Sequence, residues 1–152
     1  MSRVVVLDAG PLGLVTNPRR SPTSTACATW LQSLLADGTR VVLPEIADYE
    51  VRRELLRANK TKGIAHLDAL GKLIEYLPIT TAAMRRAAEF WAQARQQGQQ
   101  TAADTSLDAD MILAGQAMSL RESDVVIATT NVGHLGRFVR ADLWTNIKGG
   151  QP

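Results

Sequence analysis

The sequence is poor in cysteine, histidine and aromatic residues, and each scarcity excludes something. The one cysteine, Cys27, cannot form an intrachain disulfide, and with only two histidines the chain has no cluster of the kind that holds zinc. Aromatic residues make up 5% of the chain, so the core must rest on Leu, Val, Ile and Ala, and no platform for stacking nucleic acid bases is evident. The cysteine content favours a reducing, cytoplasmic setting.

Long hydrophobic runs and a strong charge imbalance are also absent. No stretch approaches the ~20 apolar residues of a membrane helix, and the apolar run that ends at Asp8 is too short for a signal peptide. We therefore expect a protein without membrane contact. The formal net charge of +2 and the pI of about 9.0 permit a nucleic acid partner without requiring one.

The length of 152 residues fits one domain, which we expect to span residues 1–148 before a flexible tail at 149–152. Short apolar runs predict strands at 4–7, 41–43, 76–79 and 125–129, with a last short element at 139–144. Helical spacing of apolar residues predicts helices at 25–36, 45–58, 64–74, 82–97 and 107–118. Residues 8–11 are expected to break the first strand, and the polar segments 17–24 and 98–104 to form loops.

This alternation predicts an α/β fold, with a central parallel sheet of about four to five strands and helices on both faces. Pro78 argues that the third strand lies at an edge or ends there. In such sheets ligands gather at the carboxyl ends of the strands.

Polar side chains stand close to the predicted ends of these strands. Asp8 follows the first strand, Glu50 lies on the helix after the second, Asp110 lies in the first turn of a later helix, and Asn131 follows the fourth strand. All four could meet at one edge of the sheet. Each acid also has an ordinary interpretation: Asp8 as a turn former or helix cap, Glu50 as a solvated helix residue that Glu54 could replace, and Asp110 as an acid favoured near a helix start.

The physics of bringing carboxylates together indicates what they could do. Three carboxylates within a few Å repel one another and raise one another's pKa. A divalent cation removes that cost, and Mg²⁺ prefers oxygen ligands. Such a cation also makes a bound water more acidic and offsets the charge of a phosphate. Convergence of the acids would therefore favour metal-dependent attack on a phosphodiester.

Four segments, taken in order, resemble the PIN-domain ribonucleases, most of all the VapC-type toxins of toxin–antitoxin systems. They are VVVLD at 4–8, PEIADYEVRREL at 44–55, LDADMILA at 107–114 and VIATTNVGHL at 126–135. Each segment is a weak signal alone, but together they follow the family's order and spacing over most of the chain. The resemblance implies a PIN-like fold and Mg²⁺- or Mn²⁺-dependent cleavage of RNA.

The resemblance assigns the core acids, which would be both catalytic groups and metal ligands, to Asp8, Glu50 and Asp110. Asn131, also a catalytic candidate, takes the place of a fourth Asp in many relatives, and Thr129 that of a hydroxyl residue near the substrate. Two positions depart from the pattern. Asn131 is neutral where a charge is common, and Gly10 stands where many relatives have a polar residue.

Contacts with the substrate and partners complete these expectations. Arg52 and Arg53 directly follow Glu50 and are the best candidates to bind phosphate. A wider phosphate path could also include Arg19, Arg20, Lys60 and Lys62. By resemblance alone, the chain is expected to form a homodimer and to have an antitoxin protein as a partner, although a stand-alone role is possible.

The same residues also bear on three alternative functions. A PIN-like module that binds RNA or protein without cutting stays open because Asn131 is neutral. A phosphoacceptor receiver domain fits poorly, since the first strand ends in the single acid Asp8 and the third ends at Pro78 and Ile79. Dinucleotide binding is excluded because residues 8–13 lack the glycine-rich pattern.

Overall fold

The chain folds around one parallel sheet. A computed structural model describes residues 3–97, 104–133 and 135–149. Its strands are β1 (Val4–Leu7), β2 (Arg40–Pro44), β3 (Glu75–Leu77), β4 (Val125–Thr129) and β5 (Ala141–Leu143). They form a five-stranded sheet in the order β3-β2-β1-β4-β5, with every neighbouring pair parallel. The predicted α/β fold with a parallel sheet is confirmed, and β3 is an edge strand as Pro78 indicated.

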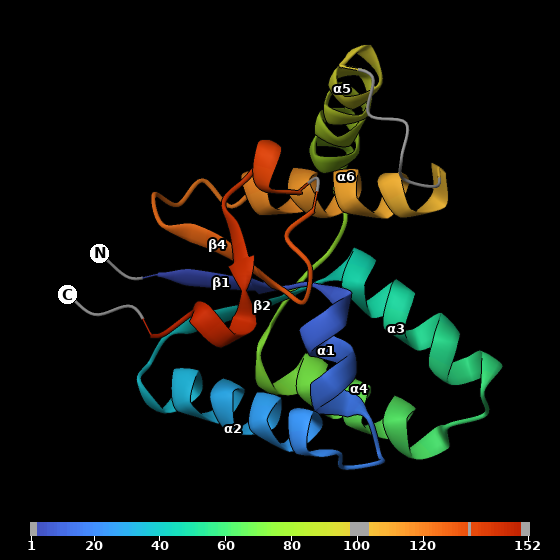
Figure 1. Cartoon of the computed structure of the whole chain (residues 1–152), viewed down its shortest axis with the longest axis vertical. Coiled ribbons are helices and arrows are strands. Elements are labelled where there is room, and N and C mark those ends of the chain that lie inside the picture. Colours follow the sequence, from blue (N-terminus) through green and yellow to red (C-terminus); the bar gives the residue numbers. More distant parts are fainter. Residues whose placement is uncertain (1–2, 98–103, 134, 150–152) are drawn as a thin grey trace.

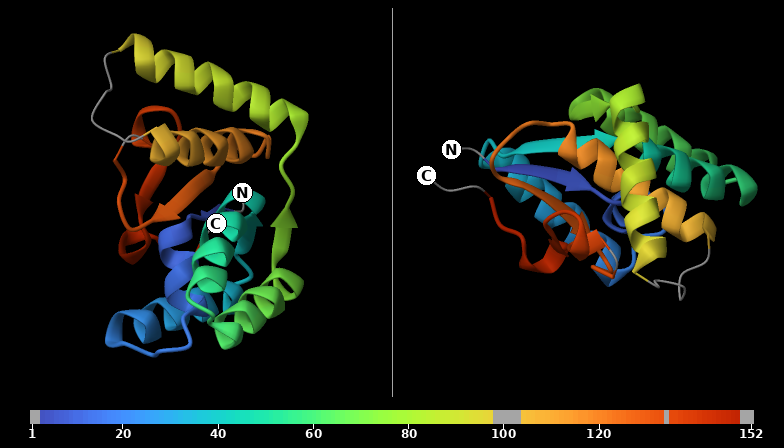
Figure 2. Two further views of the ribbon diagram at one scale, coloured as in Figure 1. Left: turned by 90° about the vertical axis from the view of Figure 1, so that its right-hand side faces the viewer. Right: turned by 90° about the horizontal axis from the view of Figure 1, so that it is seen from above.

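Helices cover both faces of this sheet. They are α1 (Ala9–Thr16), α2 (Pro22–Ala36), α3 (Glu45–Arg57), α4 (Thr61–Leu73), α5 (Thr81–Gln96) and α6 (Asp104–Met118), with 3-10 turns at Leu135–Arg137 and Trp144–Asn146. Figure 1 shows α1, α2 and α4 below the sheet and α5 and α6 above it, while α3 extends outward from the end of β2. In the views of Figure 2, α5 forms the outermost layer on its side.

Alternation along the strands builds one core on each face. Val5 and Leu7 pack with α1, α2 and α4, whereas Val4 and Val6 pack with α5 and α6. All four side chains are buried, as expected for a strand covered on both sides. In the described part of the chain, no helix is long and apolar enough to cross a membrane.

Helix α1 is the main element that the sequence did not lead us to expect. The segment after Asp8 ends the strand, as predicted, but then begins a helix at once. Asp8 caps that helix by accepting a hydrogen bond from the backbone of Ala9, and Pro11 is tolerated because the first turn needs no intrahelical N–H bonds. Pro11, which was expected only to end the strand, thus lies in the first turn of a helix.

Several boundaries also differ from the prediction. Helix α2 begins at Pro22 because Ser21 caps it, helix α4 begins at Thr61 rather than 64, and α6 begins at Asp104 rather than 107. Asp110 therefore lies in the second turn of α6, not the first. Most of the predicted loop at 98–104 and of the predicted tail at 149–152 lies outside the described residues.

Candidate active site

Asp8 is held rigidly at the junction of β1 and α1. Its backbone N–H donates to the carbonyl oxygen of Ala128 on the neighbouring strand at 2.9 Å. Its carboxylate accepts the N–H of Ala9 on one oxygen at 2.7 Å and the hydroxyl of Thr129 on the other at 2.6 Å. Both oxygens thus have a donor, and the orientation of the carboxylate is fixed before any ligand arrives.

Thr129 ends β4 with a fully buried hydroxyl. The side chain is 1% exposed, and its oxygen lies 3.1 Å from both the N–H and the carbonyl oxygen of Asn131. It therefore links Asp8 to the turn after β4. The structure shows Thr129 as a residue that orients Asp8; direct contact with a substrate, the role expected from the resemblance, stays a prediction.

Glu50 and Asp110 approach Asp8 from two helices. Both side chains are half-buried, Glu50 in the second turn of α3 and Asp110 in the second turn of α6. Burial, followed by the charge of Asp8, raises the pKa of Glu50 to about 7, and Asp110 adds to the rise while Arg53 opposes it. Burial and then the charge of Asp8 raise the pKa of Asp110 to about 6.

The pKa of Asp8 is raised as well. Burial is the main cause, and the hydrogen bonds from Thr129 and Ala9 oppose it. Three acids with raised pKa values, of which Glu50 and Asp110 both sense the charge of Asp8, form an acidic cluster at the carboxyl ends of β1 and its neighbours. Such a cluster favours uptake of protons or of a cation.

The chemistry of this donor set suits a hard divalent cation, but its spacing is not that of a complete metal site. Carboxylate oxygens are the ligands that Mg²⁺ and Mn²⁺ take. Within the described part of the chain, however, no group of three His, Cys, Asp or Glu side chains is placed to hold a metal ion. The acids are thus close enough for the charge of Asp8 to act on the other two. Metal binding stays a prediction.

A groove runs from this cluster along α3. Its volume is about 530 Å³, and α1 and α3 form its walls. Its lining includes Ala9, Gly10, Gly13, Asn17, Glu50, Arg53, Glu54, Arg57 and Lys60. Gly10 lets α1 pack closely against the residue after β4, since a Cβ there would lie 2.5 Å from the hydroxyl oxygen of Thr130. The α1 wall was not among the sequence-based expectations, because local propensity does not favour a helix over the segment that carries Gly10 and Gly13.

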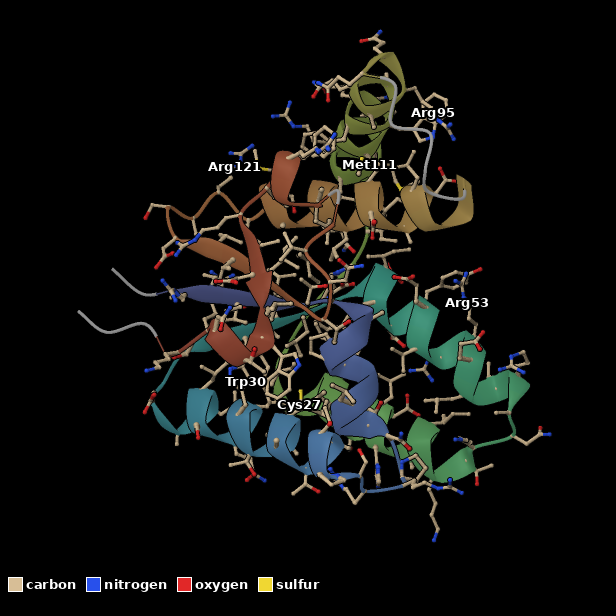
Figure 3. The ribbon with its side chains drawn as sticks, in the orientation of Figure 1. Cys27, Trp30, Arg53, Arg95, Met111 and Arg121 are labelled. Carbon is tan, nitrogen blue, oxygen red and sulfur yellow. The ribbon has the colours of Figure 1, made fainter. Side chains whose placement is uncertain are left out.

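The two arginines after Glu50 are in different surroundings. Arg52 forms ion pairs with Asp48 at 2.9 Å and Asp68 at 2.7 Å, so it ties α3 to α4. Arg53 is exposed, lies over the ring of Tyr49 with 5.1 Å to the centroid, and lines the groove. Figure 3 shows Arg53 on the outer side of α3. Only Arg53 is therefore available to the groove.

Asn131 follows β4 on an exposed turn. Its backbone N–H donates to Thr129, and its side-chain oxygen lies 3.5 Å from the position that a Cβ on Gly133 would take. Among the hydrogen bonds of the described residues, none joins its side chain to the three acids. The backbone of Asn131 thus belongs to the site, and a catalytic role of its amide stays a prediction.

Comparison with known proteins gives the fold a context. The sequence matched no protein-family model and no curated protein. The structure is similar to VapBC2 from Rickettsia felis, bound to a DNA fragment from their promoter, with TM-score 0.70 and 14% identity over 93% of this chain and 98% of that one. It is also similar to FitAcB from Neisseria gonorrhoeae (TM-score 0.68, 21% identity, 94% and 99% covered) and to VapBC-1 from nontypeable Haemophilus influenzae (0.68, 19%, 94% and 99%).

These identities are low, so the likeness is one of fold. It extends over nearly the whole length of each chain. The resemblance to VapC-type PIN domains, first drawn from four short segments, is confirmed at that level.

Proposed function

We propose that the chain is a metal-dependent ribonuclease of the PIN type, and the toxin of a toxin–antitoxin pair. One observation carries the proposal: Asp8, Glu50 and Asp110, from three separate elements, form a half-buried acidic cluster in which burial and then the charge of Asp8 raise the pKa of the other two. Such an arrangement costs free energy unless a cation or protons compensate it. The VapBC-like fold around the cluster supports this interpretation.

The residues of the cluster have distinct parts in the proposed hydrolysis of an RNA phosphodiester bond. Asp8, fixed by Thr129 and Ala9, supplies an oriented carboxylate that would hold Mg²⁺ or Mn²⁺ together with Glu50 and Asp110. When bound, the cation would lower the pKa of water and offset phosphate charge. Glu50, with a pKa of about 7 in the cation-free protein, can also hold or release a proton near neutral pH.

The test is cleavage of labelled RNA by purified protein with Mn²⁺ or Mg²⁺, beside an EDTA control. Asp8→Asn and Asp110→Asn should reduce the rate by ~100-fold or more, the scale on which a catalytic side chain contributes. Asp108→Asn is the matched control for Asp110→Asn, because Asp108 is an exposed acid on the same helix. For the Glu50→Gln variant the control is Glu54→Gln, because Glu54 is an exposed acid one turn further along the same helix. No metal-dependent cleavage by folded protein on several RNAs would reject the nuclease.

Partners form part of the proposal. Since VapBC structures share this fold, we propose a protein antitoxin that binds this chain, and a homodimer of the chain itself. An apolar hollow of about 400 Å³ between α5 and α6, lined by Met84, Trp91, Met111 and Ile112 among others, is the surface best suited to self-association. Light scattering of wild-type and Trp91→Glu protein tests the dimer, which the added charge should dissociate.

A second candidate function is a PIN-like module that binds RNA without cutting it. The neutral Asn131 and the lack of a three-carboxylate group at metal-holding distance in the described residues favour this candidate. RNA binding with a normal melting temperature and no turnover in Mn²⁺ would identify it.

A further inference from the structure

A basic groove continues beyond the acidic cluster. The groove between α1 and α3 reaches Lys60, and a second hollow of about 520 Å³ is lined by Pro18, Arg19, Asn59, Lys60, Thr61 and Lys62. Lys60 borders both hollows, so they lie next to each other. The start of α4 packs against the segment after α1, because a Cβ on Gly63 would lie 3.4 Å from the ring of Pro18.

Ion pairing separates the cations of this region into two groups. Arg52 is held by Asp48 and Asp68, and Arg57 by Glu54, so their charges are already balanced within the protein. Arg19, Lys60 and Lys62 are exposed, and among the ion pairs of the described residues none includes them. Arg20 borders a different hollow, beside His66.

The backbone directs the free cations to one place. Asn59 has a positive φ of 55°, which reverses the chain between α3 and α4 and sets Lys60 at the end of the groove. The first turn of α4, which has no side-chain cap, borders the same hollow, so its partial positive charge adds to that of the lysines.

We propose that Arg53, Lys60, Lys62 and Arg19 form a phosphate track, along which the sugar–phosphate backbone of a single-stranded RNA runs away from the acidic cluster. The proposal rests on the proposed function for its starting point. From Glu50 to Arg57, the last residue of α3, the helix rises ~10 Å at 1.5 Å per residue, and Lys60 lies beyond its end. One strand of a duplex carries a phosphate every ~3.4 Å, so the track spans several phosphates.

The chemistry of the lining favours RNA backbone over other anions. The free cations line two adjoining hollows that share Lys60, and this extended arrangement suits the repeated charges of a nucleic acid strand better than a single small anion. Neither hollow is lined by an aromatic residue among the described side chains, and the ring of Tyr49 is covered by Arg53, so the linings offer no stacking platform for bases. The track should therefore hold RNA without regard to its sequence, and leave the choice of cleavage site to the residues at the acids.

The experiment measures binding of a fluorescein-labelled oligouridylate of roughly 12 nucleotides, a length within the usual site size for single strands. Fluorescence anisotropy is recorded in EDTA, so cleavage does not contribute, at several salt concentrations. Each phosphate contact on a single strand contributes a slope of about −0.7 to log K against log[salt]. We expect Arg19→Gln/Lys60→Gln/Lys62→Gln protein to lose ~2 from that slope and to bind at least ~10-fold more weakly at low salt.

Matched control variants separate the track from general charge. Lys72→Gln and Arg85→Gln remove exposed cations from α4 and α5, outside both hollows, and should leave the affinity and slope unchanged. Equal losses in the control variants, or a triple variant that binds like wild type, would overturn the track. All these residues are exposed, so equal melting temperatures are expected throughout.

Two further outcomes distinguish the track from the proposed function. RNA binding that depends on the three cations, with no cleavage in Mn²⁺, would leave the track standing and reject the nuclease. Cleavage that depends on Asp8 but binding that ignores the three cations would reject the track alone. Displacement of the oligouridylate by an oligoglutamate of equal charge at equal concentration would assign the groove to an acidic peptide instead, and overturn the RNA assignment.

Discussion

The hydroxyl of Thr129 is the side-chain group that orients Asp8, at a distance of 2.6 Å. Thr129→Val keeps the shape of the side chain and removes this donor, so the buried carboxylate loses a charge-assisted hydrogen bond. We expect a loss of roughly 2 kcal/mol in the free energy of unfolding at pH 8 and a large fall in any metal-dependent cleavage. Urea denaturation and the cleavage assay measure the two effects.

Thr129→Ser is the control, because it keeps the hydroxyl. It should retain cleavage while losing only the stability contributed by one buried methyl group, about 1 kcal/mol. A valine variant as active as wild type would mean that Asp8 does not need this donor.

Neighbouring arginines should respond differently to the same substitution. Arg52→Gln leaves Asp48, of which 13% of the side chain is exposed, without its cation, and should lower the free energy of unfolding by ~1 kcal/mol. Arg53→Gln removes an exposed cation from the groove and should change stability by less than ~0.5 kcal/mol while weakening RNA binding. Urea denaturation and anisotropy on both proteins check the contrast, and a reversed order would contradict the assignment of Arg53 to the groove.

At the scale of elements, close contact between α5 and α6 decides what a helical glycine can become. A Cβ on Gly115 would clash with the carbonyl oxygen of Ala83, whereas a Cβ on Gly71 in α4 would find an ordinary contact with Tyr76 at 3.8 Å. Alanine is favoured over glycine in a helix by ~1 kcal/mol, but overpacking costs ~1–3 kcal/mol. We expect Gly71→Ala to raise the melting temperature and Gly115→Ala to lower it, by calorimetry; a stabilised Gly115→Ala would mean that the two helices can separate freely.

The elements also show how far sequence patterns reach. Continuous apolar runs identified β1, β2 and β4, because burial on both faces leaves a simple signal. Helix α1 was missed because its eight residues contain a proline and two glycines, so local propensity opposes it. The helix forms since Leu12 is buried against the sheet and Asp8 caps its start. Tertiary packing outweighs propensity here, and no local pattern records it.

Some features of the candidate site could likewise be predicted from the sequence, and others depend on the folded chain. Asp8 could be proposed from the sequence because it directly follows a strand, whereas Glu50 was preferred over Glu54 only through the family resemblance. The difference between Arg52 and Arg53 could not, since it depends on Asp68 from another helix. The burial of Thr129 depends likewise on segments that meet only in the folded chain. The same holds for the two hollows that lie next to each other at Lys60.

At the scale of the whole molecule, the acidic cluster makes stability depend on pH. The folded-state pKa values of Glu50 and Asp110, about 7 and about 6, lie above the ordinary values of 4.5 and 3.8, and that of Asp8 is raised as well. Stability from groups with raised pKa values is fully present below the ordinary values and is lost as pH rises through the folded values. The pKa of Glu75 is lowered, first by its hydrogen bond with Arg40. The stability that Glu75 contributes is therefore lost only as pH falls below its ordinary value of 4.5.

The cation-free protein should therefore become less stable between about pH 4.5 and pH 7, by on the order of 2 kcal/mol for Glu50 alone after allowance for solvent screening of this half-buried group. Urea denaturation in EDTA at several pH values measures this fall. Glu50→Gln should flatten the curve and be more stable than wild type at pH 8, because a neutral amide needs no compensation. Mn²⁺ should restore the stability of the wild-type protein at pH 8, since a ligand that binds only the folded state stabilises it, and should have little effect on Asp8→Asn. Stability that stays level or rises across the window would mean that the pKa values of the buried acids are not raised, and with that the physical ground for a cation between them would be lost.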